Sequence, residues 1–296
     1  MEVHVSKQAE LMDGLLRKMH FKDEYSNSDI LNKVLQIKRN TPESRFAITK
    51  KFSHFLELVE WKGMEIIHVF PKDTADRIVV FLHGGAYIHE LNAGHLVYIQ
   101  ELASKLKADV YAPLYPLAPK HECLESIQLV DRFLVEILEK GEETILMGDS
   151  AGGGMAVSVC QLLFEKKEKL PDRIVLFSPW LDVTDSNQEE KFYEESDPVL
   201  SIEGLRTCGK EWAGRLSPED PRVSPFFGET SFLPPVLMFC GGNELFYPTI
   251  IQFHERLTAE GVYCKLVTAP GLFHDYAMYP IPEGKATLNT VAAFVQ

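Results

Sequence analysis

Cysteine is scarce in this sequence, and none stands in a metal-binding spacing. The chain has 296 residues and five cysteines. Their number is odd, they are widely scattered, and no Cys-x-x-Cys pair occurs, so neither a disulfide framework nor a zinc site is indicated. We therefore expect reduced thiols, most of them buried, in a cytoplasmic protein; they are Cys123, Cys160, Cys208, Cys240 and Cys264.

Long apolar runs and an excess of basic residues are also missing. No stretch approaches the ~18–20 apolar residues that span a membrane, and residues 1–7 contain no apolar segment of signal-peptide length. The formal net charge is −13, from 43 acidic and 30 basic residues. Nucleic acids and anionic lipids call for a basic face, so we expect neither a nucleic acid nor a membrane as partner.

What the sequence does contain is an alternation of strand and helix patterns. This alternation specifies an α/β fold, a mostly parallel eight-stranded sheet with helices on both faces, and the length suits one domain over residues 1–296. A Lys62-Gly63 break predicts a hairpin between the first two strands. The strands are expected at 54–61, 64–70, 77–82, 109–114, 144–146, 173–177, 235–240 and 262–268. Helices are expected at 7–20, 27–39, 94–107, 122–139, 150–167, 201–213, 246–260 and 283–294.

Two segments do not follow this alternation of strands and helices. The helices at 7–39 precede any strand, and more than fifty residues between Trp180 and Pro234 show no buried-strand pattern. The second segment is rich in acid and proline, and its helix has Ser201 as expected N-cap with Glu203 in the first turn. A long insertion at a strand end usually serves as a lid or binding loop. The alternative is a solvated surface excursion.

The motif that organises the chain is Gly148-Asp149-Ser150-Ala151-Gly152, between an apolar strand and an apolar-periodic helix. Its Gly-x-Ser-x-Gly spacing is that of a nucleophile elbow, a sharp turn that holds a serine hydroxyl clear of the sheet. The helix N-terminus that follows offers free N–H groups to an oxyanion. Chance produces this spacing roughly 0.07 times in such a chain. Ser150 is therefore the candidate nucleophile, provided that partners for it exist.

A second glycine turn supplies candidate oxyanion donors. The buried strand at 77–82 ends in His83-Gly84-Gly85-Ala86-Tyr87, which has the shape of a His-Gly-Gly-Gly oxyanion loop with alanine in the last position. Consecutive glycines let backbone N–H groups approach a ligand closely. We expect the N–H groups of Gly84, Gly85 and Ala151 to form the oxyanion hole, and His83 to anchor the loop by hydrogen bonds. An ordinary strand-to-helix glycine turn is the alternative.

His274 and Glu244 are the candidate base and acid that a serine nucleophile needs. Each follows a predicted parallel strand, at the end where the loops of this architecture converge. The order Ser150, Glu244, His274 is the order of an α/β-hydrolase triad. Asp275 is the competing acid. Adjacent residues rarely face each other so as to pair through the histidine Nδ1, which favours Glu244.

With these motifs in place, the chain resembles the hormone-sensitive-lipase-like branch of the α/β-hydrolases, the short-acyl carboxylesterases. The resemblance runs from about residue 62 to the C-terminus and implies a helical cap built from about 1–45 and 186–232. It implies structural roles for Asp149 and Asp182, and pairing of two copies through the edge strand at 262–268. Glutamate stands where the family usually has the aspartate of Asp-Pro-Leu. The matching segments are 83–87, 115–119, 148–153, 178–182 and those that carry Glu244 and His274.

The predicted function is hydrolysis of small-molecule carboxylic esters through an acyl-enzyme, without a metal or organic cofactor. The resemblance implies short-chain acyl or acetyl esters. Hydrolysis of amides or formamides by the same residues is one alternative. A non-catalytic ligand receptor on a hydrolase scaffold is another, disfavoured because such proteins typically lack the base.

Overall fold

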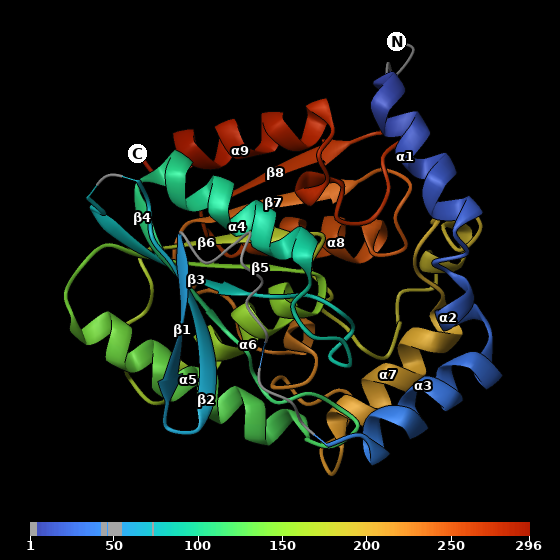
Figure 1. The fold of residues 1–296 in the computed structure, drawn as a ribbon, viewed down its shortest axis with the longest axis horizontal. Helices are drawn as coiled ribbons and strands as arrows, with labels where there is room; N and C mark the ends of the chain where they lie inside the picture. Colours follow the sequence, from blue (N-terminus) through green and yellow to red (C-terminus); the bar gives the residue numbers. More distant parts are fainter. Residues whose placement is uncertain (1–4, 43–45, 47–54, 73) are drawn as a thin grey trace.

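Within the described residues, eight strands form one sheet in the order β1-β2-β4-β3-β5-β6-β7-β8 (Figure 1). The structure is a computed structural model, and it describes residues 5–42, 46, 55–72 and 74–296. His54, the first residue of the first predicted strand, lies outside them. The strands are β1 (Leu56–Trp61), β2 (Met64–Val69), β3 (Arg77–Leu82), β4 (Ala108–Pro113), β5 (Thr144–Asp149), β6 (Arg173–Phe177), β7 (Val236–Gly241) and β8 (Cys264–Ala269). All eight predicted strands are therefore confirmed.

The sheet is parallel from β4 across to β8 and antiparallel at its other end. β1 and β2 form the predicted hairpin, and β2 runs antiparallel to β4. Lys62 and Gly63 both have positive φ, +48° and +86°, which is the backbone of a two-residue turn whose twist matches the paired strands. In the parallel part the carboxyl ends of successive strands share one edge.

Helices cover both faces because the central strands are apolar on both sides. Ile78, Val80 and Leu82 of β3 face one core, while Val79 and Phe81 face the other. α5 (Cys123–Glu139), α6 (Ser150–Glu165) and α8 (Tyr247–Ala259) pack in the first core, and α4 (Ala93–Leu106) and α9 (Pro282–Phe294) in the second. Burial on both faces is the reason that these strands read as continuous apolar runs.

The remaining helices gather at one end of the molecule, on the right of Figure 1. They are α1 (Lys7–Lys18), α2 (Asp23–Ser26), α3 (Ser28–Asn40) and α7 (Ile202–Ala213). α2 packs so closely on α7 that a Cβ at Gly204 would lie 2.3 Å from the Tyr25 carbonyl oxygen. Segments about 180 residues apart in sequence thus meet here. α2 lies between the two helices predicted at 7–20 and 27–39, where no helix was predicted.

Ser201 stands at the N-cap of α7 as predicted, but its side chain makes no capping hydrogen bond. The Glu194 carboxylate caps the helix instead, accepting a hydrogen bond from the Ile202 N–H at 3.0 Å. Short 3₁₀ turns complete the insertion and the C-terminal region: η1 (Glu190–Phe192), η2 (Pro225–Phe227) and η3 (Tyr276–Met278).

All five cysteines are free thiols, and four of them are buried, in agreement with the prediction. Among the helices of the described residues, none has the length and apolar character needed to cross a membrane.

Candidate active site

The turn between β5 and α6 has the geometry of a nucleophile elbow. Ser150 has a φ of +47°, a left-handed conformation that costs energy for a residue with a side chain. A Cβ at Gly148 would lie 2.5 Å from the backbone of Gly152, and one at Gly152 would lie 2.0 Å from the Leu82 carbonyl oxygen. Both flanking positions therefore require glycine.

His274 reaches this serine from the turn that follows β8. Its Nε2 lies 3.0 Å from the Ser150 Oγ, across 124 residues of sequence, and both side chains are buried. The Phe246 ring packs against the imidazole edge-on, with the ring centroids 5.2 Å apart. The predicted nucleophile and base are thus within hydrogen-bonding distance of each other.

Glu244 lies on the opposite side of the imidazole and is fully buried. Its Oε1 is 3.8 Å from the His274 Nδ1, which is an ion-pair distance and longer than a hydrogen bond. Neither of these two atoms has another hydrogen-bond partner. The structure therefore brings the predicted acid to the correct ring nitrogen, with one short movement needed to close the hydrogen bond.

Ser178, at the end of β6, holds Glu244 in place. Its hydroxyl donates to the Glu244 Oε2 at 2.6 Å, and the Gly241 N–H donates to the same oxygen at 2.8 Å. The Ser178 Oγ also accepts from the N–H of Asp275 at 3.1 Å. One buried hydroxyl thus links the loops of the acid and the base. Sequence reasoning gave Ser178 no role, although the Ser-Pro-Trp motif after a buried strand marked its position.

Asp275 does not lie where an orienting acid would. Its Oδ2 is 3.1 Å from the His274 Nε2, the nitrogen that faces Ser150, and not near Nδ1. This agrees with the argument that neighbouring residues do not pair through Nδ1. Burial lowers the pKa of His274, but the carboxylates of Asp275 and Glu244 more than offset this effect and raise it well above its usual value.

The oxyanion loop differs from prediction at one position. The Gly84 N–H donates to the buried Asp149 Oδ1 at 2.9 Å, so this amide is already occupied and does not face a substrate oxygen. The N–H groups of Gly85 and Ala86 make no hydrogen bond within the described chain, and Gly85 has a φ of +118°. Sequence reasoning interpreted Ala86 only as the replacement for a third glycine and gave its N–H no role.

His83 anchors this loop, as expected. Its Nδ1 lies 2.8 Å from the Gly84 carbonyl oxygen, and its ring stacks on the Tyr115 ring with the centroids 4.4 Å apart. Burial lowers the pKa of His83 to about 4, so the ring is neutral near pH 7. Asp149 accepts from Gly84 and contacts the His95 Nε2 at 3.2 Å. Asp182 accepts hydrogen bonds from Thr184 and Ser186. Both aspartates thus make structural contacts.

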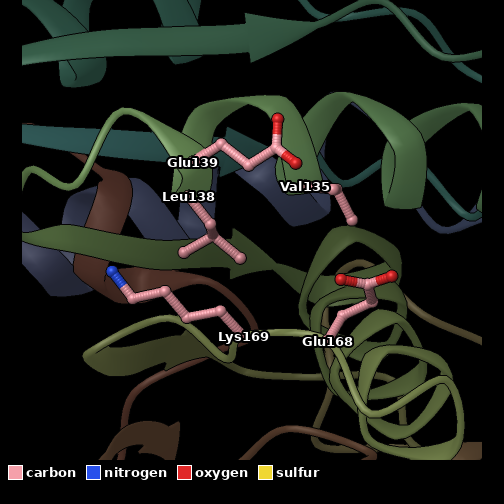
Figure 2. Close-up of a pocket in the computed structure, with 5 residues that line it drawn as sticks. All are labelled: Val135, Leu138, Glu139, Glu168 and Lys169. Atoms are coloured by element: carbon pink, nitrogen blue, oxygen red, sulfur yellow. The ribbon is translucent and has the colours of Figure 1, made fainter.

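A small cavity of about 80 Å³ lies elsewhere, between the end of α5 and the segment before β6 (Figure 2). In Figure 2, Val135, Leu138 and Glu139 line one side, and Glu168 and Lys169 the other. These segments lead into the first residues of β5 and β6, so the cavity is at the sheet edge opposite Ser150. In the described part of the chain no group of three or more His, Cys, Asp or Glu residues could hold a metal ion.

Comparison with known proteins agrees with this geometry. Residues 79–278 match the family model described as alpha/beta hydrolase fold. The chain belongs to the α/β-hydrolase fold family. An esterase of Acinetobacter venetianus is 31% identical over 228 residues, which cover 75% of each chain. An acetyl-hydrolase of Streptomyces hygroscopicus is 27% identical over 233 residues, covering 77% of this chain and 78% of that protein.

A solved structure extends the comparison to the fold. The crystal structure of the hormone-sensitive-lipase homologue EstE7, from a metagenome library, superposes with a TM-score of 0.82, at 21% identity and over 98% of both chains. Within the α/β-hydrolase family the chain is a carboxylic ester hydrolase of the hormone-sensitive-lipase-like branch. The resemblance stated from its motifs is confirmed.

Proposed function

We propose that the chain hydrolyses carboxylic esters through an acyl-enzyme on Ser150. The observation that carries this proposal is the 3.0 Å contact between the Ser150 Oγ and the His274 Nε2. His274 takes the hydroxyl proton as Oγ attacks the ester carbonyl, and it then gives that proton to the leaving alcohol. Water, deprotonated by the same nitrogen, attacks the acyl-enzyme; the bond between the acyl carbon and the Ser150 Oγ breaks, the acid is released, and His274 returns the proton to Oγ. These steps use no metal or organic cofactor.

Glu244 orients the base in this proposal. A proton on Nδ1 leaves Nε2 free to accept from Ser150, and the Glu244 carboxylate favours that tautomer. The positive charge that forms on the ring strengthens the attraction between Nδ1 and Oε1. We expect the 3.8 Å separation to shorten in that state.

The oxyanion hole that we propose consists of the N–H groups of Gly85, Ala86 and Ala151. Gly84 is replaced in this set because its amide is bound to Asp149. Ala151 follows the nucleophile in the first turn of α6, where backbone N–H groups lack helical partners. A Cβ at Gly152 would lie 2.0 Å from the Leu82 carbonyl oxygen and 2.6 Å from that of His83, so the end of β3 and the loop after it lie directly beside the elbow.

The substrate class that we propose is small esters with short acyl chains, acetyl esters among them. The name of the acetyl-hydrolase relative supports this choice. We further propose that about 1–45 and 186–232 form a cap over the site, which sets the acyl length that fits. The grouping of α1, α2, α3 and α7 at one end of the molecule supports a cap, and residues 1–4 and 43–45 of it lie outside the described residues.

Turnover of a graded series of p-nitrophenyl esters by wild type and Ser150→Ala tests this function. We expect wild type to cleave acetyl and butyryl esters fastest and the variant to lose almost all of the activity. An inactive wild type, or a variant that keeps most of the rate, would overturn the proposal. A matched anilide series separates ester from amide hydrolysis, and faster anilide cleavage would favour the amidase alternative.

We also propose a cytoplasmic location and a homodimer. Five free thiols support a reducing compartment such as the cytoplasm. β8 is an edge strand, and two copies paired along it would form a continuous sheet across a homodimer. Sedimentation velocity tests the pairing: a dimer is expected for wild type, and a monomer for a variant with proline within β8.

A further inference from the structure

Two side-chain oxygen atoms lie within hydrogen-bonding distance of the same nitrogen of the proposed base. The His274 Nε2 lies 3.0 Å from the Ser150 Oγ and 3.1 Å from the Asp275 Oδ2. A general base needs a free lone pair on Nε2, whereas an ionised carboxylate at that distance favours a proton there. The contact with Asp275 therefore bears on when His274 can act as a base.

The backbone holds Asp275 in this position. Asp275 has a φ of +57°, a left-handed conformation that Asp and Asn tolerate better than most residues. Its N–H donates to the Ser178 Oγ at 3.1 Å. The side chain is 17% exposed, and its Oδ1 is buried without a hydrogen-bond partner. The carboxylate thus has His274 as its polar partner.

We propose that Asp275 is a second carboxylate partner of the catalytic histidine, acting at Nε2, the nitrogen that exchanges a proton with Ser150. The proposal rests on the role of His274 as base. When Nε2 takes the serine proton, Asp275 accepts a hydrogen bond from the new N–H, and the proton stays on the nitrogen. When the proton passes to the leaving alcohol, the carboxylate is still ionised.

The surroundings of the pair determine its pH dependence. His274 is faced by Glu244 at Nδ1 and by Asp275 at Nε2, with the apolar Phe246 ring against its edge. Asp275 interacts electrostatically with His274, Asp149 and Glu244, and also with His95 and Tyr279. Burial raises the pKa of Asp275, and His274 opposes that increase. Removing the Asp275 charge should therefore stabilise neutral His274 and extend activity to lower pH.

NMR of protein labelled with ¹⁵N-histidine tests this directly in wild type and Asp275→Asn. Asparagine tolerates the left-handed backbone, and Asp275→Gly, which also fits, is the second variant. The His274 signal is identified by its loss in His274→Gln. We expect the pKa of His274 to fall by about one to three pH units, as for loss of a charge partner at this distance. We also expect the neutral ring of both variants to hold a smaller fraction of the Nε2–H tautomer, and a larger fraction of the Nδ1–H tautomer, than the wild-type ring.

The acid limb of kcat/KM against pH should move down by the same amount. Asp109→Asn is the matched control. The Asp109 Oδ1 lies 3.2 Å from the His68 Nε2, and this carboxylate–imidazole pair is remote from His274. That variant removes a carboxylate from the side of another imidazole and should leave the pKa and tautomer of His274 unchanged. Unchanged His274 pKa and tautomer in both Asp275 variants would overturn the proposal. NMR needs no turnover, so this result stays distinct from failure of the esterase function.

Discussion

At the scale of single residues, the two carboxylates beside His274 have different expected roles. Glu244→Gln keeps the shape of the acid but removes the charge that orients Nδ1. We expect kcat to fall about 10²- to 10⁴-fold at the alkaline plateau, where His274 is neutral. Asp275→Asn should lower the plateau less than about tenfold, because Nδ1 keeps its partner. Steady-state kinetics on p-nitrophenyl acetate measures both kcat values. A larger loss in Asp275→Asn than in Glu244→Gln would contradict the assignment of Glu244 as the acid.

Ser178 is expected to be a positioning residue. Ser178→Ala removes the donor to the Glu244 Oε2 and leaves the N–H of Asp275 without an acceptor. Loss of a buried hydrogen bond to a charged group predicts a fall in kcat of about 10- to 100-fold, with KM little changed.

Ser126→Ala is the control for Ser178→Ala. Ser126 is a buried serine whose hydroxyl donates only to the Pro116 carbonyl oxygen, away from the triad. Equal losses of kcat in the two variants would argue that Ser178 has no special role.

Residue-scale geometry was the part least accessible from sequence. The triad could be predicted because motif spacing and chain order are visible in one dimension. The contact of Asp275 with Nε2, the Ser178 hydroxyl and the diversion of the Gly84 N–H to Asp149 could not. Each depends on a left-handed turn or a buried side-chain direction, and no periodicity encodes these.

At the scale of elements, the proposed cap depends on close packing of α2 against α7. Gly204→Ala would place a Cβ 2.3 Å from the Tyr25 carbonyl oxygen, so the helices must separate. We expect a loss in the free energy of unfolding of about 1–3 kcal/mol, measured by urea denaturation. Gly14→Ala in α1 is the control, because nothing lies within 4 Å of a Cβ there. A Gly204→Ala protein as stable as the control would contradict this packing argument.

Two buried carboxyl groups in the insertion predict that stability declines as pH rises from the acidic range to about 9. Burial raises the pKa of Asp185 to about 9 and that of Glu190 to about 8. Neither Asp185 oxygen has a hydrogen bond, although Arg206 lies 3.5 Å away. Because the folded-state pKa is the higher one, the folded protein binds more protons between the unfolded and folded values. Stability therefore falls as pH rises through this range.

Asp185→Asn should remove part of that decline. We expect its free energy of unfolding to drop about 1–3 kcal/mol less than that of wild type between pH 6 and pH 9. Asp29→Asn, at an exposed position on α3, should follow wild type. Parallel curves for Asp185→Asn and wild type would show that Asp185 does not contribute.

The elements themselves were largely predictable from the sequence. Strands such as β3 and β5 are buried on both faces, so apolar runs mark them without ambiguity. α2 was the exception, because a single helical turn of polar residues shows no apolar periodicity. The capping of α7 by Glu194 was equally hidden, since the carboxylate comes from eight residues upstream.

At the scale of the whole molecule, the sheet brings distant residues to one edge. β5, β6, β7 and β8 are successive parallel neighbours, and the segments at their carboxyl ends carry Ser150, Ser178, Glu244 and His274. The acid and the base lie in the loops that follow β7 and β8, whereas the proposed cap consists of two segments whose described residues contribute no strand to the sheet. Chemistry and substrate selection are thus assigned to separate parts of the chain.

Trapping the acyl-enzyme shows directly whether Ser150 carries the acyl group. Wild type is mixed with p-nitrophenyl acetate, quenched in acid during the burst, and mapped by peptide mass spectrometry. One acetyl group is expected on the peptide that contains Ser150, and none in Ser150→Ala. An acetyl group on another residue, at a level that matches the burst, would contradict an acyl-enzyme on Ser150.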